Sequence, residues 1–170
     1  RIHKCYTAMT VSSQLAADHY AEAFGIHESK ILPLGVPRTD IFFSEEYKKA
    51  IIPQVEAAFP MVKDAKEVIM YAPTFRGVNA KNASFPMDMI DFDAWGEYLH
   101  ESHSVMLIKM HPFVKEPLNI PEQYRDVIVD ASAYREINNM LFVTDLLITD
   151  YSSVIYEFSL FHKPMLFYAF

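Results

Sequence analysis

The segment Leu146–Ser153 reads Leu-Leu-Ile-Thr-Asp-Tyr-Ser-Ser, an apolar run that changes abruptly to polar side chains. A short run of this kind, bounded by turn residues, predicts a buried strand. The following residues Val154–Phe161 predict a helix. The segment therefore predicts a strand that ends in a tight turn and leads into a helix, the basic repeat of a parallel α/β sheet.

Two further apolar runs end in the same way. Glu67–Tyr71 leads into Ala-Pro-Thr-Phe-Arg-Gly at 72–77, and Val105–Lys109 leads into Met-His-Pro at 110–112. Helix-like stretches alternate with these runs, which predicts an α/β fold with a Rossmann-like parallel sheet flanked by helices. The other predicted strands are Tyr6–Ser12, Lys30–Leu34, Val127–Val129 and a last one from Met165, and the other predicted helices are Gln14–Phe24, Glu45–Ala58, Phe92–His103 and Arg135–Phe142.

Composition excludes several classes of function. The 170 residues are 51% apolar and 22% charged, an ordinary globular balance, and the net charge of −7 argues against nucleic acid as a partner. The same charge gives no support for direct adsorption to an anionic membrane. The longest apolar region, Leu141–Phe158, is interrupted by three carboxylates, so no membrane helix is predicted. Cys5 is the single cysteine, which rules out an internal disulfide, fits a reducing compartment and predicts a buried free thiol.

The carboxyl ends of the three strands are the predicted site. In open parallel sheets, ligands bind outside these ends, so the polar residues after each strand should meet at one edge. The simpler alternative is that polar residues begin wherever a strand stops. A histidine, an arginine and a serine pair are unusual choices for that purpose, which favours a site.

The turn after Thr149 predicts a phosphate site. The first N–H groups of the next helix lack intrahelical partners and can bind an anion, with help from the hydroxyls of Ser152 and Ser153. Alternatively, Asp150 or Ser152 is a helix N-cap. Glu157 lies on the same helix face as Ser153, where it could accept hydrogen bonds from ribose hydroxyls or could simply be solvated.

His111 is the predicted catalytic group. Pro112 holds it extended at the strand end, and imidazole can act as an acid or base, or bind phosphate when it is charged. Lys109 precedes it inside the strand, partly buried, and its role is open. A lone histidine is more often structural, but the position at the strand edge favours function.

Cations for phosphate come from two other segments. Arg76 is a planar fork for phosphate, and Thr74 can add a hydroxyl. Arg38, in the turn that begins at Gly35, is a second candidate near a predicted hinge. No carboxylate pair or His-Cys set has the spacing of a metal site, so no metal is predicted.

Four segments together resemble the C-terminal part of the CDP-glycerol glycerophosphotransferase family, the teichoic-acid primases and polymerases. They are Leu34–Asp40, Tyr71–Arg76, Lys109–Pro112 and Thr149–Phe158. The resemblance implies the C-terminal half of a GT-B type two-domain transferase, present as a fragment. Residues 1–43 would then end the N-terminal acceptor-side domain and form the hinge, and residues 44–170 would be the CDP-polyol-binding domain, truncated at its C-terminus.

The resemblance also implies a reaction. An acceptor hydroxyl of a polyol-phosphate polymer or lipid-linked acceptor would attack CDP-glycerol, the donor substrate, and release CMP without a cofactor. The diphosphate would contact Arg76, Ser152 and Ser153, the ribose Glu157, and His111 would stabilise transition-state charge or transfer a proton. The family works in the cytoplasm, peripherally at the inner face of the bacterial cell membrane, which this chain would reach only through parts outside it.

Two alternatives remain open at this point. A GT-B glycosyltransferase that uses CDP-ribitol or a nucleotide-sugar would share the fold and the contact between helix and diphosphate. The chain could also be a donor-binding module that is inactive alone.

Overall fold

The computed structural model describes residues 2–169 and divides into two compact units. The first ends at Ser44 and the second begins at Glu45. The assignment of the first unit to an acceptor-side domain stays a prediction.

The first unit is a small strand–helix–strand arrangement. Strands β1 (Met9–Thr10) and β2 (Ile31–Leu32) pair in parallel, and helix α1 (Gln14–Phe24) connects them. Helix α1 begins as predicted after Ser13, whose Oγ accepts a hydrogen bond from Ala16 N at 3.3 Å, and it ends at Gly25, whose φ of 60° suits glycine. Both strands are shorter than predicted because pairing between them covers only two residue pairs.

Three 3-10 helices complete this unit, η1 (Ile2–Cys5), η2 (Glu28–Lys30) and η3 (Pro37–Phe43). The core is a cluster of Val11, Ala17 and Ile31. Cys5 is exposed, so the predicted burial of its thiol was wrong. The physical reason is local, since η1 buries none of its residues.

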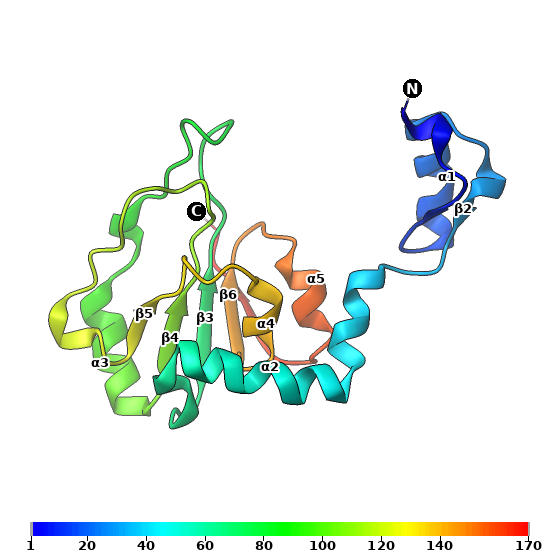
Figure 1. Cartoon of the computed structure of the whole chain (residues 1–170). Coiled ribbons are helices and arrows are strands. Elements are labelled where there is room, and N and C mark those ends of the chain that lie inside the picture. The colour runs from blue at the N-terminus through cyan, green and yellow to red at the C-terminus, as the bar shows by residue number, and fades with distance from the viewer. Residues whose placement is uncertain (1, 170) are drawn as a thin grey trace. The chain divides into compact units, whose positions relative to one another are not determined.

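The second unit contains a five-stranded, fully parallel sheet in the order β5-β4-β3-β6-β7 (Figure 1). The strands are β3 (Val68–Ala72), β4 (Val105–Ile108), β5 (Ile128–Asp130), β6 (Leu146–Thr149) and β7 (Met165–Phe167). The helices are α2 (Glu45–Ala58), α3 (Phe92–Ser102), α4 (Ile137–Leu141) and α5 (Val154–Ser159), with 3-10 turns η4 (Pro60–Lys63), η5 (Met87–Met89) and η6 (Glu122–Tyr124). The predicted Rossmann-like parallel sheet flanked by helices is confirmed.

The order of the strands reverses between β3 and β6. From β3 the chain moves outward through β4 to β5, and it then returns to the other side of β3 to add β6 and β7. Right-handed crossovers in opposite directions place α3 and α5 on opposite faces of the sheet. The β3–β6 boundary is therefore the switch point, where ligands bind in open α/β sheets.

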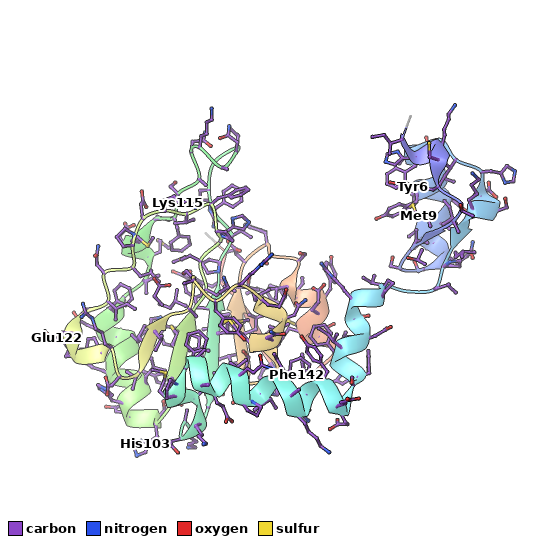
Figure 2. All side chains as sticks on the ribbon, in the orientation of Figure 1. Tyr6, Met9, His103, Lys115, Glu122 and Phe142 are labelled. Atoms are coloured by element: carbon purple, nitrogen blue, oxygen red, sulfur yellow. The ribbon has the colours of Figure 1, made fainter. Side chains whose placement is uncertain are left out.

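The core lies on both faces of the sheet because its central strands β3, β4 and β6 are buried along almost their whole length. Ile69, Tyr71 and Ile148 belong to the cluster that packs with Leu99 of α3. Side chains alternate along a strand, so Met70 and Leu147, both at 0% exposure, point to the other face. In this unit the Phe142 ring, labelled in Figure 2, lies 5.8 Å from Tyr47 of α2 and 5.3 Å from Phe161.

The amino ends of the central strands are fixed by one carboxylate. Asp145 Oδ2 accepts a hydrogen bond from Val68 N at 3.0 Å, which ties the start of β3 to β6. Lys163 Nζ reaches Asp145 Oδ1 at 2.9 Å and the Thr144 carbonyl at 2.6 Å. Within residues 2–169, every helix is too short or too polar to cross a membrane.

Gly96 gives a direct test of the packing between α3 and η6. A Cβ added at Gly96 would overlap the ring of Tyr124. Alanine favours helix by about 1 kcal/mol over glycine, but overpacking costs roughly 1–3 kcal/mol, so the overlap should win. We expect Gly96→Ala to lower the free energy of unfolding by about 1–2 kcal/mol in chemical denaturation.

The matched control is Glu97→Ala, one residue away on the exposed side of the same helix. It should change the free energy of unfolding by less than about 0.5 kcal/mol. A Gly96→Ala protein as stable as the wild type would mean that α3 and η6 do not pack as described.

Candidate functional site at the carboxyl edge of the sheet

Asp150 joins the two strands at the switch point. It follows β6, its side chain is fully buried, and it accepts hydrogen bonds from Thr74 N at 2.8 Å and Thr74 Oγ1 at 2.9 Å. Its own loop contributes Tyr151 N at 2.7 Å. Next to it, Thr149 Oγ1 donates to the carbonyl of Ala72 at 2.6 Å. The exits of β3 and β6 are therefore held together by side chains beyond the last strand hydrogen bonds.

Arg76 belongs to the same network. Its Nη1 donates to Asp150 Oδ2 at 3.0 Å, to the Thr74 carbonyl at 3.0 Å and to Thr74 Oγ1 at 3.1 Å. Its backbone pairs with Ser84 through two hydrogen bonds, and Gly77 turns the chain with a φ of 113°. The Arg76 side chain as a whole keeps 31% of its surface exposed, although its Nη2 atom is buried. Arg76 is thus held in one place at the exits of β3 and β6, with its side chain only partly buried.

The charge of Asp150 is stabilised by these donors. Burial alone would raise the pKa of Asp150, but the hydrogen bonds from Thr74, Tyr151 and Arg76 outweigh it and hold the pKa below its ordinary value. Asp150 therefore stays ionised and binds Arg76. A buried carboxylate would repel phosphate by itself, so its contribution at this edge is to position Thr74 and Arg76.

The serine pair lies where the chain enters α5. Ser153 is exposed and its hydroxyl does not cap the helix, whereas Ser152 Oγ accepts a long hydrogen bond of 3.4 Å from Val154 N. Glu157 is buried at 6% exposure, so it is not the solvated helix carboxylate that the sequence left open. Helix α5 stops at Ser159 and is shorter than predicted.

His111 follows β4, the neighbour of β3. Phe113 N donates a hydrogen bond to its Nδ1 at 3.1 Å, so the neutral ring carries its proton on Nε2. Burial lowers the pKa of His111, and the positive charge of Lys109 lowers it further. The geometry therefore favours a neutral imidazole whose Nε2–H is a hydrogen-bond donor.

Two aromatic rings surround this imidazole, and the sequence analysis did not single them out. The Phe75 ring lies 4.7 Å from the His111 ring, and the Phe113 ring lies 4.6 Å from it. Phe75 sits between Thr74 and Arg76, so it links the turn after β3 to the turn after β4. The signal that could have found both was an aromatic residue within two positions of a candidate polar residue, Phe75 next to Arg76 and Phe113 two residues after His111.

Gly35 and Arg38 belong to the first unit. Gly35 has a φ of 91°, and Arg38 lies in η3. Their part in binding a donor stays a prediction. Among residues 2–169, His, Cys, Asp and Glu side chains form no group of three or more that could hold a metal ion.

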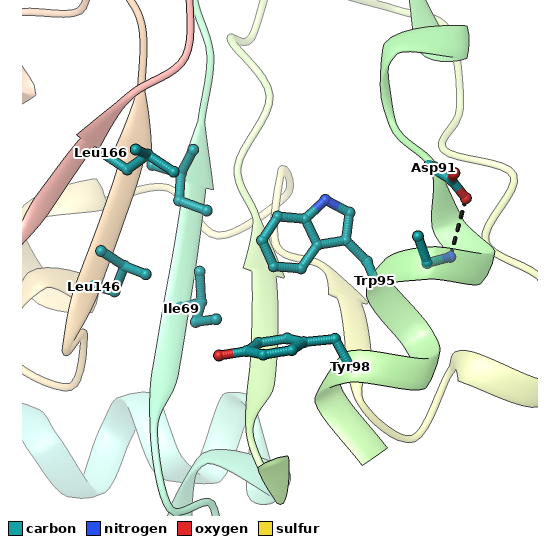
Figure 3. A pocket seen from close by; sticks show the side chains of 8 residues that line it. Ile69, Asp91, Trp95, Tyr98, Leu146 and Leu166 are labelled. Carbon is teal, nitrogen blue, oxygen red and sulfur yellow. Dashed lines mark hydrogen bonds between the residues drawn. The ribbon is translucent and has the colours of Figure 1, made fainter. Parts of the chain in front are cut away.

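An apolar cavity of about 330 Å³ lies on the α3 face of the sheet. Figure 3 shows Trp95 and Tyr98 of α3 turned toward Ile69, Leu146 and Leu166 of the sheet. An adjoining cavity of about 290 Å³ includes Tyr71, whose buried hydroxyl has no hydrogen-bond partner among the described residues. Burial raises the pKa of Tyr71, and Asp150 raises it further, so the phenol stays neutral.

These cavities are not the candidate site for an anion. The larger is lined by apolar and aromatic side chains and one carboxylate, with no cation among them. Anionic groups need cationic or hydrogen-bond donors, which gather instead at the carboxyl edge. The candidate site therefore consists of Arg76, Thr74, Asp150, His111 and the serine pair.

The chain is similar to a family of phosphotransferases and to teichoic-acid enzymes of two bacteria. The model of the family "CDP-Glycerol:Poly(glycerophosphate) glycerophosphotransferase" matches residues 1–170. The chain is 49% identical over 168 residues to the teichoic acid ribitol-phosphate polymerase TarL of Staphylococcus aureus, covering 99% of this chain and 30% of TarL. It is 33% identical over 172 residues to the teichoic acid glycerol-phosphate primase of Bacillus subtilis, covering 100% of this chain and 41% of the primase.

A similar fold is found in solved structures of the wall teichoic acid polymerase TagF. One of them, a variant soaked with CDPG, superposes with a TM-score of 0.78 at 26% identity and covers 98% of this chain and 40% of TagF. The chain thus spans less than half the length of these relatives. On the family match and these identities, the chain belongs to the CDP-glycerol:poly(glycerophosphate) glycerophosphotransferase family.

Proposed function

We propose that this chain is the donor-binding part of an enzyme that transfers a polyol phosphate from a CDP-polyol to a hydroxyl of a teichoic-acid acceptor. The observation that carries the proposal is the group of cationic and hydroxyl side chains at the switch point, Arg76 beside Thr74 and the exposed Ser153. Membership of the family supports the same reaction.

Ribitol phosphate is the proposed transferred group. The sequence alone favoured glycerol, but TarL, a ribitol-phosphate polymerase, is 49% identical, whereas the Bacillus subtilis glycerol-phosphate primase is 33% identical. The additional hydroxyls of ribitol need hydrogen-bonding partners that glycerol would leave unpaired. Glycerol phosphate is the second candidate, supported by the description of the family.

The proposed reaction is a phosphoryl transfer that needs no resident cofactor. The acceptor oxygen attacks the β-phosphorus of the donor, the bond from that phosphorus to the bridging oxygen breaks, and CMP departs with the electron pair while the acceptor loses its proton. Catalysis of this kind relies on positioning and on stabilising negative charge. Arg76, Ser152 and Ser153 would hold the diphosphate, and Glu157 would contact the ribose.

His111 would act as a hydrogen-bond donor to the phosphate. A neutral ring with its proton on Nε2 can donate to a phosphate oxygen, but it cannot accept the acceptor's proton at that nitrogen. This favours charge stabilisation over proton transfer for His111. A base for the acceptor would then come from outside this chain, in the part that binds the acceptor.

The proposed setting is the cytoplasmic face of the bacterial membrane, where a nucleotide-activated donor is available. The net charge of −7 means that any adsorption to an anionic membrane would use other parts of the complete enzyme. We also propose that the chain is inactive by itself, because the acceptor must be held by a second part.

Donor choice tests the proposed function. In calorimetry with the complete enzyme, we expect CDP-ribitol to bind about tenfold tighter than CDP-glycerol, equal to about 1.4 kcal/mol or one hydrogen bond. UDP-sugars should bind more weakly than both. Tighter binding of CDP-glycerol would identify glycerol phosphate as the transferred group. Preference for a UDP-sugar would contradict the proposed reaction.

His111 variants test the mechanism. In the complete enzyme, His111→Ala should fold and bind donor within a few-fold of the wild type but lose about 10²-fold or more in kcat. His111→Gln, which keeps an N–H donor, should recover part of that loss in single-turnover assays. Near-normal turnover of His111→Ala would contradict a catalytic role for His111. If His111→Gln recovered no activity, proton transfer by His111 would be favoured over hydrogen-bond donation.

The pH profile follows from the same geometry. Because the pKa of His111 is lowered, the neutral donor form persists to more acidic pH than in an ordinary histidine. Activity should therefore hold as the pH falls to 6.5, the ordinary histidine value, and decline only below it.

A further inference from the structure

Lys109 occupies a position that the strand would normally give to an apolar residue. It follows the fully apolar strand β4 and is only 6% exposed. Its Nζ donates a hydrogen bond to the carbonyl of Ser132 at 3.0 Å. A buried ammonium is costly unless it is paired, so an apolar side chain would stabilise this position better. The lysine therefore needs an explanation other than packing.

Ser132 binds the turn after β4 at two consecutive residues. Its carbonyl accepts from Lys109 Nζ, and its Oγ accepts from Met110 N at 3.1 Å. Ser132 is itself fixed, because its N–H donates to Asp130 Oδ1 at 2.9 Å. The turn after β5 thus holds the two residues that immediately precede His111.

The Lys109 charge also acts on His111. Burial lowers the pKa of Lys109, while Asp130 and Glu136 raise it. Burial lowers the pKa of His111, and the Lys109 cation lowers it further because it disfavours a second positive charge nearby. The two rings packed on His111 are uncharged. Two further cations belong to the turns that carry these rings. Arg76 is adjacent to Phe75 in the sequence, and Lys115 donates a hydrogen bond to the Pro112 carbonyl at 2.8 Å.

We propose that Lys109 and Ser132 form a clamp that positions His111 at the carboxyl edge. One hydrogen bond fixes the backbone of Met110 and a second fixes the side chain of Lys109, and the lysine charge opposes a second proton on the ring. The inference rests on the proposed role of His111. Misplacing a catalytic group by about 1 Å can cost 10²-fold in rate, so the two residues should affect turnover without touching the donor.

Ser132→Ala tests the positioning. It removes the acceptor of Met110 N and leaves the carbonyl that binds Lys109. In the complete enzyme, we expect kcat to fall by about 10-fold to 100-fold, while KM and the affinity for CDP-polyol stay within about twofold. The matched control is Ser104→Ala, which removes a buried hydroxyl just before the opposite end of β4, and its kcat should stay within twofold of the wild type.

Lys109→Met tests the charge. It keeps most of the side-chain volume but removes the cation, so the pKa of His111 should rise and the acid limb of the kcat profile should move to higher pH. The control Lys163→Met removes a lysine that also donates to a buried strand-end carbonyl, at the amino edge of the sheet, and should leave the acid limb in place. In Ser132→Ala, which keeps the Lys109 cation, the limb should also stay where it is.

The outcomes separate the clamp from the proposed function. If the complete enzyme bound no CDP-polyol, the proposed function would fail. If the wild type were active and His111→Ala inactive, but Ser132→Ala turned over normally, the positioning role would be wrong. If Lys109→Met lost stability and rate with an unmoved acid limb, Lys109 would be a structural residue only, and the clamp would be overturned.

Discussion

The buried carboxylate of Asp150 is the contact on which the carboxyl edge depends. It accepts hydrogen bonds from Thr74, Tyr151 and Arg76 across the boundary where the strand order reverses. Parallel strands bring their ends to one edge, but their ladder hydrogen bonds stop before the turns that follow. Asp150 extends the connection into those turns. An ionised carboxylate here also explains why Arg76 is held in one place while 31% of its side-chain surface stays exposed.

Around this contact the polar groups have different electrostatic roles. Arg76 is a permanent cation, whereas burial and the nearby Lys109 lower the pKa of His111, and Phe113 N donates a hydrogen bond to its Nδ1. A neutral donor stabilises charge that develops on a phosphate without competing with Arg76 for the carboxylate of Asp150. The division fits the proposed transfer from a CDP-polyol to a hydroxyl, in which one group holds the diphosphate and another stabilises charge on the phosphate that is transferred.

The sequence predicted most of the second unit because its signals are local. Apolar runs located every strand of the sheet, and the residues that follow β3, β4 and β6 supplied the candidate site. The contacts between segments could not be read in the same way. Asp150 was expected at a phosphate or as a cap, and its pairing with Thr74 joins residues that are far apart in sequence. The burial of Glu157 and the hydrogen bonds that Ser132 accepts from the β4 turn also depend on packing between elements. Cys5 was predicted buried from its residue type, and the short η1 turn leaves it exposed.

The central claim is that the donor diphosphate binds at the carboxyl edge across the switch point, and a crystal structure of the complete enzyme with a CDP-polyol tests it most directly. The account predicts phosphate oxygens within hydrogen-bond distance of Arg76 and of Ser152 or Ser153, with His111 Nε2 facing the β-phosphate. A diphosphate bound elsewhere, for example in the apolar cavity beside Trp95 on the α3 face, would contradict it.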